Sequence, residues 1–350
     1  GYFVSLNRSK KSVDIDLKSQ EGKEAFLSLV TSADVLVENF RPGVMERLGL
    51  SFETLSELNH RLVYAAIRGF GDPRSGKSPY SDWPSYDVVA QAMGGVMSLT
   101  GPDAGSFTKV GPGIGDIFSG MVMAFGIMAA LRHADAYGTG QFVDVAMYDA
   151  VLSLCERAVY LNDFHGTTPG PEGNNHPFLA PFGLFKAQDG AVAIGIVDDK
   201  FWQILANAME GETLSRNPKF ATRSARAENK DELNSLVETW TKSRTKAELS
   251  AMLGGKVPFG PLNSIQDIVD DPHVANRNML TQVSNPDDPK APWTVASNPL
   301  RFSASESPLL GSPPRLGQHN AQYLSPDPEK AARQFDPRTL RSAFGKFATG

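Results

Sequence analysis

Apolar and polar side chains alternate at residues 12–17, and this period of two predicts a half-buried strand. A short run at residues 34–37 predicts a buried strand, and the apolar run at residues 62–67 predicts the next strand. Helices are predicted among these strands by the helical spacing of apolar positions and by start signals, at residues 21–30, 44–48 and 51–58. Strands that alternate with helices in this way are typical of βαβ units, so we expect an α/β fold with a parallel sheet.

The middle of the chain continues with a helix at residues 85–97 and a glycine-rich approach, residues 110–116, to a helix at residues 117–134. Asp116 is expected to cap that helix. Because no run of about 18 apolar residues occurs, we expect no membrane span. Residues 121–131 are interpreted instead as part of a buried helix.

A strand at residues 142–145 then meets a helical pattern at residues 147–161, with Asp149 in the first helical turn. Asp149 lies among apolar residues that include Met147 and Ala150. A carboxylate in such surroundings needs either a partner or a function. The helix dipole, however, already favours an acidic residue in the first turn. The residues alone therefore leave both explanations open.

The second half of the chain predicts a smaller α+β unit. Gly, Pro and Asn are concentrated at residues 166–177, which indicates a linker or an active-site loop, and residues 188–190 give a hairpin signal. The other predicted elements are strands at 182–186, 191–197, 280–283 and 293–303, helices at 200–209, 230–243, 246–253 and 264–269, and a rigid turn at 257–262. We therefore predict a large domain at 1–165, a linker at 166–181, a small domain at 182–278, a segment returning to the large domain at 279–325 and a Pro- and charge-rich tail at 326–350.

Composition narrows the class of protein. The 350 residues carry 34 Lys and Arg against 39 Asp and Glu, and a net charge of −5 argues against a general nucleic-acid binder. The single cysteine, Cys155, cannot form an internal disulfide, which indicates a reducing compartment. We expect a cytoplasmic protein, or a mitochondrial or peroxisomal one in a eukaryote. The chain enters a folded-looking pattern directly at Gly1, without a signal peptide, and we expect that its natural beginning is missing.

Candidate ligand-binding residues follow the predicted parallel strands. Asn39, Arg41, Arg68 and Phe70 lie at the carboxyl ends of two of them, where ligands of such sheets bind. Cations and an amide there suit an anionic ligand, although ordinary surface charge also explains each residue taken alone. The chain has no dinucleotide fingerprint, no P-loop, no serine-hydrolase elbow and no His/Cys/carboxylate spacing typical of a metal site. We therefore predict no metal and no permanently bound cofactor.

Five segments, in order and at suitable spacing, resemble the class III CoA-transferases, the CaiB/BaiF-type family that contains formyl-CoA transferase and carnitine CoA-transferase. They are residues 12–18, 37–43, 111–120, 140–150 and 257–261. The resemblance implies an open Rossmann-like domain joined to a small domain, in an interlocked homodimer. It also implies that a first strand and helix precede Gly1.

The resemblance further implies a mechanism. The transferases of this family use an aspartate at the position of Asp149 as a nucleophile, and it carries CoA as an aspartyl-CoA thioester between an acyl-CoA and a carboxylic acid. By the same matching, the residues at CoA-contacting positions are Ile15, Lys18, Asn39, Phe40, Arg47, Arg68 and Phe70. Lys18 and the arginines are expected at phosphates, and Ile15 and Phe40 beside the adenine. Arg68 and Phe70 replace a Lys and a Tyr of formyl-CoA transferase.

Two alternatives stay open. The related α-methylacyl-CoA racemases use a His-Asp pair; Asp116 matches their aspartate, but Tyr86 stands in place of their histidine and is a poor base at neutral pH. The other alternative is an inactive, dimeric CoA-binding protein.

The substrates are predicted only as a class. Residues 173–183 lack the glycine run of formyl-CoA transferase, so oxalate and formyl-CoA are not favoured. We expect a succinyl-CoA-type donor and a small carboxylic acid, with dicarboxylic acids among the candidates. Asn175 and His176 are candidates for contacting a carboxylate of that acid, and a purely structural loop is the alternative.

Overall fold

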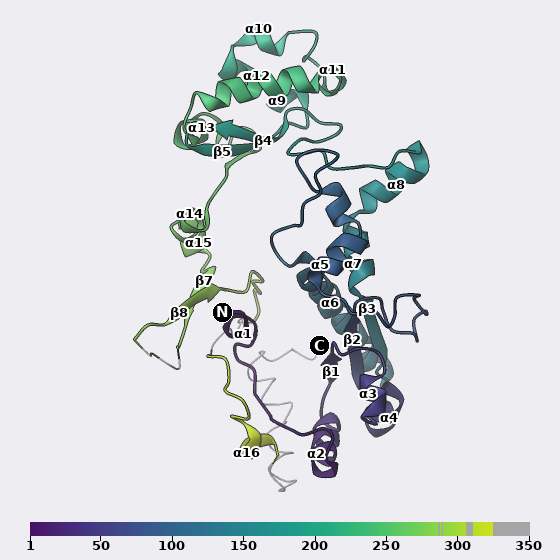
Figure 1. Ribbon diagram of the computed structural model, residues 1–350. Helices are drawn as coiled ribbons and strands as arrows, with labels where there is room; N and C mark the ends of the chain where they lie inside the picture. Colours follow the sequence, from purple (N-terminus) through teal and green to yellow (C-terminus); the bar gives the residue numbers. More distant parts are fainter. Residues whose placement is uncertain (286–287, 289, 306–310, 325–350) are drawn as a thin grey trace. The chain divides into compact units, whose positions relative to one another are not determined.

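The computed structural model describes residues 1–324, with gaps at 286–287, 289 and 306–310, and its chain divides into two compact units (Figure 1). The first unit contains residues 1–82, 121–145 and the described residues from 265 to 324, and the second contains residues 83–120 and 146–264. The predicted tail at 326–350 lies outside the described residues. The predicted domain boundaries stay a prediction.

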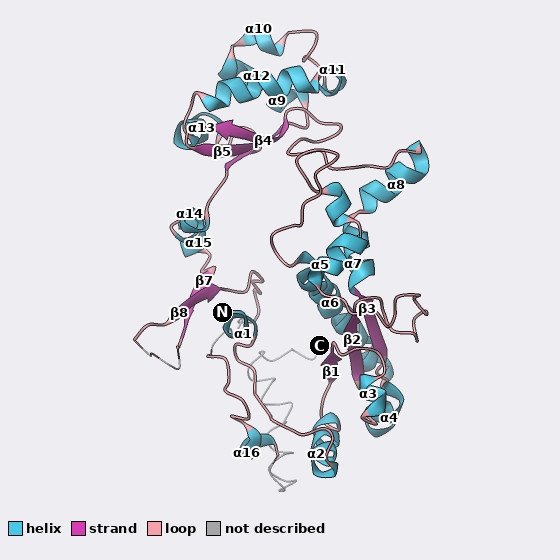
Figure 2. Ribbon diagram, in the orientation of Figure 1, coloured by secondary structure: helices cyan, strands magenta, loops and turns pink. Residues whose placement is uncertain are grey.

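The first unit is built on a three-stranded sheet in the order β1-β2-β3 (Figure 2). Strands β1 (Val35–Glu38) and β2 (Val63–Arg68) pair in parallel, with Val35 opposite Val63, and β3 (Phe142–Ala146) follows β2 in the sheet. The connection from β1 to β2 contains α3 (Val44–Arg47) and α4 (Phe52–Leu58), as a parallel pair requires. The predicted α/β class with a parallel sheet is confirmed.

Apolar side chains from these elements and from α2 (Gln20–Val30) form the core of the first unit. Leu55, Leu62 and Tyr64 are almost completely buried, and the rings of Tyr64 and Phe142 stack with centroids 5.2 Å apart. Gly140 is required where the chain enters β3, because a Cβ there would lie 2.0 Å from the carbonyl oxygen of Leu62. The unit also contains α6 (Ile114–Tyr137) from Met121 onward, α1 (Tyr2–Leu6), α14 (Ile265–Val269), α15 (Pro272–Asn276), β7 (Leu280–Val283), β8 (Trp293–Ala296) and α16 (Asn320–Tyr323).

The predicted strand at residues 12–17 is wrong, although its alternation of exposure is real. Val13, Ile15 and Leu17 are half-buried and the residues between them are exposed. The backbone finds its partners in α16 and its cap, because the Ser12 N–H donates to Nδ1 of His319 at 3.0 Å and the Asp14 N–H donates to Oδ1 of Asn320 at 2.8 Å. Side chains therefore replace the neighbouring strand that the pattern predicted.

The second unit contains an antiparallel sheet in the order β4-β5-β6 (Figure 2). The predicted hairpin is confirmed as β4 (Phe182–Ala187) and β5 (Gly190–Gly195), whereas the predicted rigid turn contains a third strand, β6 (Phe259–Pro261). The core of the unit is formed by Trp202, Phe220, Val237, Leu249 and neighbouring apolar residues. Its C-terminal helices are α9 (Asp199–Met209), α10 (Glu212–Ser215), α11 (Arg223–Glu228), α12 (Lys230–Lys242) and α13 (Lys246–Leu253).

Helices of the middle region complete the second unit and differ in places from the sequence prediction. They are α5 (Asp87–Met93), the 3₁₀ helix η1 (Val96–Leu99), the start of α6 (Ile114–Tyr137), α7 (Met147–Leu154) and α8 (Glu156–His165). The predicted single helix at 147–161 is divided at Cys155, whose φ of −96° and ψ of 17° interrupt the helical geometry. Asp116 is not the cap of α6 but lies within its first turn.

The interpretation of residues 121–131 as a buried helix is wrong in part. Met123 and Ala130 of α6 are buried, but Met121, Phe125 and Met128 are 63%, 79% and 65% exposed. With 24 residues and a mean hydropathy of 1.8 over its most apolar window, α6 is the one helix in the described part of the chain with the length and composition to cross a membrane. Met123 and Ala130 lie seven residues apart and so share one face, whereas the exposed residues lie on the other, and α6 is therefore a helix with one buried and one exposed apolar face.

Candidate active site

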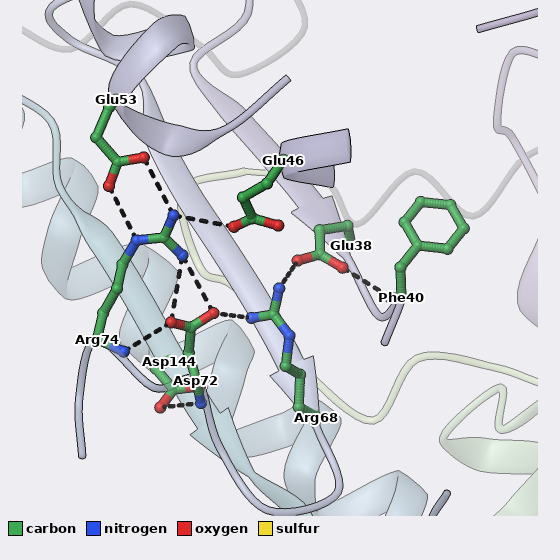
Figure 3. A network of polar contacts seen from close by, with 8 residues as sticks. All are labelled: Glu38, Phe40, Glu46, Glu53, Arg68, Asp72, Arg74 and Asp144. Atoms are coloured by element: carbon green, nitrogen blue, oxygen red, sulfur yellow. Dashed lines mark hydrogen bonds and ion pairs between the residues drawn. The ribbon is translucent and has the colours of Figure 1, made fainter. Parts of the chain in front are cut away.

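A buried ion pair joins the carboxyl ends of β1 and β2 (Figure 3). Nη2 of Arg68 donates to Oε1 of Glu38 at 2.7 Å, and each side chain is only 3% exposed. Nη1 of Arg68 lies 2.6 Å from Oδ2 of Asp72 on its other side. Burial raises the pKa of Glu38, and the nearby charge of Arg68 opposes that rise. The Arg68 guanidinium is thus neutralised by two carboxylates of the same unit.

Glu38 also holds the backbone that follows β1. Its Oε2 accepts a hydrogen bond from the Phe40 N–H at 2.7 Å (Figure 3). Asn39 is exposed and Phe40 is 47% exposed, so both side chains are accessible at the strand end. The ion pair therefore fixes the position from which these two predicted CoA contacts project.

Arg47, another predicted CoA contact, is exposed at the end of α3, one turn after Gly43. Gly43 caps α3 with a φ of +79°, and a Cβ on it would lie 2.9 Å from Nη1 of Arg47. The arginine head group thus packs on a position where the backbone conformation favours glycine.

A second arginine fixes the loop that follows β2. Arg74 donates to both carboxylate oxygens of Glu53, at 3.0 and 3.1 Å, and contacts Glu46 and Asp72 (Figure 3). The hydrogen bonds from Arg74 lower the pKa of Glu53 to about 2. Asp144 of β3 accepts the Asp72 N–H with both oxygens at 3.0 Å, and burial raises the pKa of Asp144. The loop after β2 is therefore tied to three neighbouring elements, α3, α4 and β3.

The other predicted CoA contacts differ in accessibility. Phe70 is 8% exposed, and its ring packs against Tyr80 with centroids 5.5 Å apart. Ile15 is half-buried, and Lys18 is exposed with its backbone N–H donating to Oδ1 of Asp16 at 2.9 Å. The structure brings Asn39, Phe40 and Arg68 together through Glu38. The CoA contacts of all seven residues stay predictions.

Asp149 is exposed in the first turn of α7, directly after β3. The neighbouring Met147, Ala150 and Val151 are buried, so they anchor the turn and leave the carboxylate on its accessible side. Its carboxylate is neither hydrogen-bonded nor ion-paired to any residue that the structure describes. The helix cap, Ala146, has no side-chain acceptor for the N–H groups of the first turn. An unpaired carboxylate beside uncapped backbone donors is suited to nucleophilic chemistry.

Asp116, the aspartate named by the racemase alternative, is exposed in the first turn of α6, and its charged neighbour is Asp87. Asp87 accepts hydrogen bonds from the Gly115 N–H at 2.8 Å and from Nε2 of Gln91 at 2.9 Å, and thereby holds the start of α6. Burial and, secondly, the charge of Asp87 raise the pKa of Asp116. Tyr86, in place of the racemase histidine, is 78% exposed at the cap of α5. The Asp87 carboxylate therefore has a structural role, since its hydrogen bonds hold the first turn of α6 in place.

The sequence prediction missed Glu38, Asp72 and Arg74 as organising residues. One signal was present, because an acidic residue ends β1 and a basic residue ends β2. In parallel strands these ends lie at one edge of the sheet, so opposite charges there predict a pair. Among the residues that the structure describes, no group of three or more His, Cys, Asp or Glu side chains is placed to hold a metal ion.

Comparison with known proteins supplies the family. The model of CoA-transferase family III matches residues 1–320. The chain is 44% identical to the succinyl-CoA:mesaconate CoA-transferase of Haloarcula hispanica, over 93% of this chain and 81% of that protein. It is 35% identical to the acetyl-CoA:oxalate CoA-transferase of Acetobacter aceti, over 88% of this chain and 77% of that protein.

A solved structure agrees with this match. The crystal structure of a CAIB/BAIF family protein from Brucella suis superposes with a TM-score of 0.78 at 32% identity, covering 96% of this chain and 84% of that one. The resemblance given by the five sequence segments is confirmed. The chain belongs to CoA-transferase family III, and it is a class III CoA-transferase.

Proposed function

We propose that this enzyme transfers CoA from a succinyl-CoA-type thioester to a small dicarboxylic acid, with Asp149 as the nucleophile. The observation that carries the proposal is the exposed, unpaired Asp149 carboxylate at the junction of β3 and α7. The relatives support the substrate class, because mesaconate and oxalate, named for two of them, are both dicarboxylic acids.

The first half-reaction begins when a carboxylate oxygen of Asp149 attacks the thioester carbonyl of the donor. The C–S bond breaks, CoA leaves as the thiolate, and a mixed anhydride remains on Asp149. The thiolate then attacks the aspartyl carbonyl, the donor acid leaves as a carboxylate, and an aspartyl-CoA thioester is formed. Each attack places negative charge on a carbonyl oxygen, which N–H donors at the start of α7 are suited to stabilise.

The second half-reaction is the reverse of the first, with the acceptor acid in place of the donor acid. The acceptor carboxylate attacks the aspartyl thioester and expels CoA thiolate, which attacks the acceptor carbonyl of the new anhydride. The acceptor leaves as its CoA thioester, and the Asp149 carboxylate is regenerated. No proton transfer to carbon and no oxidation occurs in either half, so neither a general base for carbon nor a redox cofactor is required.

For CoA itself, the exposed strand end after β1 is the proposed contact surface. Phe40 offers an exposed ring for the adenine, and Arg47 and Lys18 offer exposed cations for the phosphates. Arg68 is buried between two carboxylates, so we assign it a positioning role through Glu38 rather than a direct phosphate contact. We also propose that the enzyme is an interlocked homodimer.

The test of the nucleophile is Asp149→Asn, which keeps the shape of the side chain and removes its nucleophilic oxygen anion. We expect a fall in kcat of at least about a thousandfold, in line with the loss of other covalent nucleophiles. Incubation of the unchanged enzyme with succinyl-CoA and no acceptor should give a CoA adduct on the peptide that contains Asp149, detected by mass spectrometry, and the variant should give none.

Asp231→Asn is the matched control, because Asp231 is also an exposed acid in the first turn of a helix, α12. Its activity and adduct should match those of the unchanged enzyme. Turnover that survives Asp149→Asn would rule out Asp149 as the nucleophile.

A further inference from the structure

A histidine and an arginine that take no part in the proposed nucleophilic attack contact each other in the second unit. Nη1 of Arg157, in α8, lies 3.2 Å from Nε2 of His176, in the loop before β4. The other ring nitrogen, Nδ1, accepts a hydrogen bond from the Phe178 N–H at 3.1 Å. The ring also packs edge-on against Phe182, with centroids 5.1 Å apart, so its orientation is held from two sides.

The hydrogen-bonding capacity of the imidazole does not match these neighbours. A neutral histidine has one nitrogen that accepts and one that donates. Because Nδ1 accepts from Phe178, the ring hydrogen is on Nε2, and it faces an arginine nitrogen that carries only hydrogens. Protonating the ring would place hydrogens on both nitrogens and would not supply the missing acceptor. Two donor groups therefore face each other.

The charged groups around His176 also indicate that a negatively charged acceptor is missing. Burial, Arg157 and Arg223 lower its pKa, and Glu172 alone among its charged neighbours opposes them. The surroundings of His176 therefore contain two positive charges, Arg157 and Arg223, and one negative charge, Glu172. An anion placed between Arg157 and His176 would accept hydrogen bonds from both, and a carboxylate is the planar anion that arginine binds best.

A cavity beside the pair has room for such a ligand. It has a volume of about 300 Å³ and is lined by Arg157 and by Asn175, the residue directly before His176. Leu99, Leu154 and Leu161 give the cavity an apolar wall that suits a short hydrocarbon body. Glu172 also lines it, so we expect the cavity to accept one carboxylate and to disfavour a second one within the same space.

Asn175 is positioned by the fold. Its backbone forms an isolated bridge with Gly183, where a Cβ would lie 2.1 Å from the carbonyl oxygen of Asn174. Its side-chain oxygen accepts a hydrogen bond from Nδ2 of Asn234 at 3.1 Å. The loop that carries His176 is therefore tied to β4 and to α12 rather than free.

We propose that Arg157 and His176 bind a carboxylate of the acid substrate, namely the carboxylate of a dicarboxylic acid that does not react at Asp149. This assignment rests on the proposed function for its substrate class, and it turns that class into a structural requirement: acids with a second carboxylate are preferred over acids of the same length without one.

The first experiment measures binding and needs neither CoA nor turnover. The pKa of His176 in the full chain is followed by NMR, with its signal assigned through His176→Gln, in the presence and absence of succinate. A bound carboxylate favours the charged imidazolium, so succinate should raise the pKa of His176, and binding should strengthen as the pH falls through that value. The shift should be absent in Arg157→Gln. A pKa of His176 that succinate leaves unchanged would overturn the proposal.

The second experiment separates this subsite from the transfer reaction. Succinate is compared as acceptor with butyrate, which has the same chain length and one carboxylate, and glutaryl-CoA is the donor for both so that the transfer to succinate gives a distinct product. Arg157→Gln should raise the KM for succinate roughly tenfold or more and leave that for butyrate within about twofold, because a charge-assisted bond is lost only for the diacid. Arg157→Lys should recover part of the loss. Arg216→Gln, at an arginine that is 78% exposed and paired with Glu212, is the control and should change neither KM.

An equal rise in KM for both acids would overturn the assignment of the second carboxylate. If the unchanged enzyme transferred CoA to neither acid, the proposed function would fail, whereas the NMR titration would still decide whether Arg157 and His176 bind a carboxylate.

Discussion

At the scale of single residues, Glu38 is the side chain on which the predicted CoA surface depends. One of its oxygens accepts from Arg68 and the other from the Phe40 N–H, so one carboxylate connects a buried cation to an exposed loop. We expect Glu38→Gln to destabilise the fold by about 3 kcal/mol, because it leaves a buried guanidinium with one carboxylate fewer. Since the same change loosens the Phe40 backbone, we also expect a higher KM for the acyl-CoA with a smaller change in kcat.

Glu46→Gln is the control for that prediction. Glu46 belongs to the same network, but its side chain is 37% exposed and it contacts Arg74 rather than the loop after β1. Urea unfolding and steady-state kinetics should show a small change in stability and an unchanged KM for the acyl-CoA. Equal effects of the two substitutions would show that Glu38 does not position the loop specifically.

At the scale of elements, the sequence correctly predicts the helices and strands whose formation depends on residues close together in the chain. The apolar run of β2 is buried in the sheet, and the hairpin of β4 and β5 follows its Asp189-Gly190 turn signal. The predicted burial of β1 is wrong, because Val37 is 57% exposed and Val35 and Leu36 are half-buried at the edge of the sheet. The prediction from sequence fails where a residue's structure depends on a partner that is distant in the sequence. The alternating segment at residues 12–17 has α16 as its neighbour instead of a strand, and the buried ion pair between Arg68 and Glu38, which lie 30 residues apart, was not predicted. The place of Asp149 in the first turn of α7 could be predicted because it depends on a junction of two adjacent elements, and its role as nucleophile stays a prediction.

Asp87, which holds the start of α6, provides a testable prediction at the scale of elements. Asp87→Ala should lower the free energy of unfolding by about 1–3 kcal/mol, because the Gly115 N–H and the Gln91 amide lose a half-buried acceptor. It should also lower the pKa of Asp116, since the charge of Asp87 is one cause of its rise. Urea unfolding checks the first effect and NMR titration the second.

Asp103→Ala is the comparison for Asp87→Ala, because Asp103 also accepts a backbone N–H, that of Gly105 at 3.0 Å, but in an exposed loop. Water can replace that lost acceptor, so stability should change by less than about 0.5 kcal/mol. Similar losses in the two variants would mean that Asp87 is an ordinary surface contact.

At the scale of the whole molecule, the exposed face of α6 needs a covering surface. Met121, Phe125 and Met128 lie seven residues or fewer apart along the helix, and all three are more than half exposed. Burying one such side chain contributes about 1.5–3 kcal/mol, so three of them favour association strongly. The proposed homodimer supplies a second chain of the same sequence as the cover, and it explains an apolar helix without requiring a membrane.

Phe125→Glu tests that explanation, because it places a charge at the most exposed of the three positions. We expect light scattering to show a dimer for the unchanged protein and mainly monomer for the variant. Leu316→Glu makes the same change at a residue that is 82% exposed in a loop, and this variant should stay dimeric. A dimer that survives Phe125→Glu would place the interface elsewhere. Flotation of the unchanged protein with lipid vesicles, lost in the variant, would instead identify the α6 face as a membrane-binding surface.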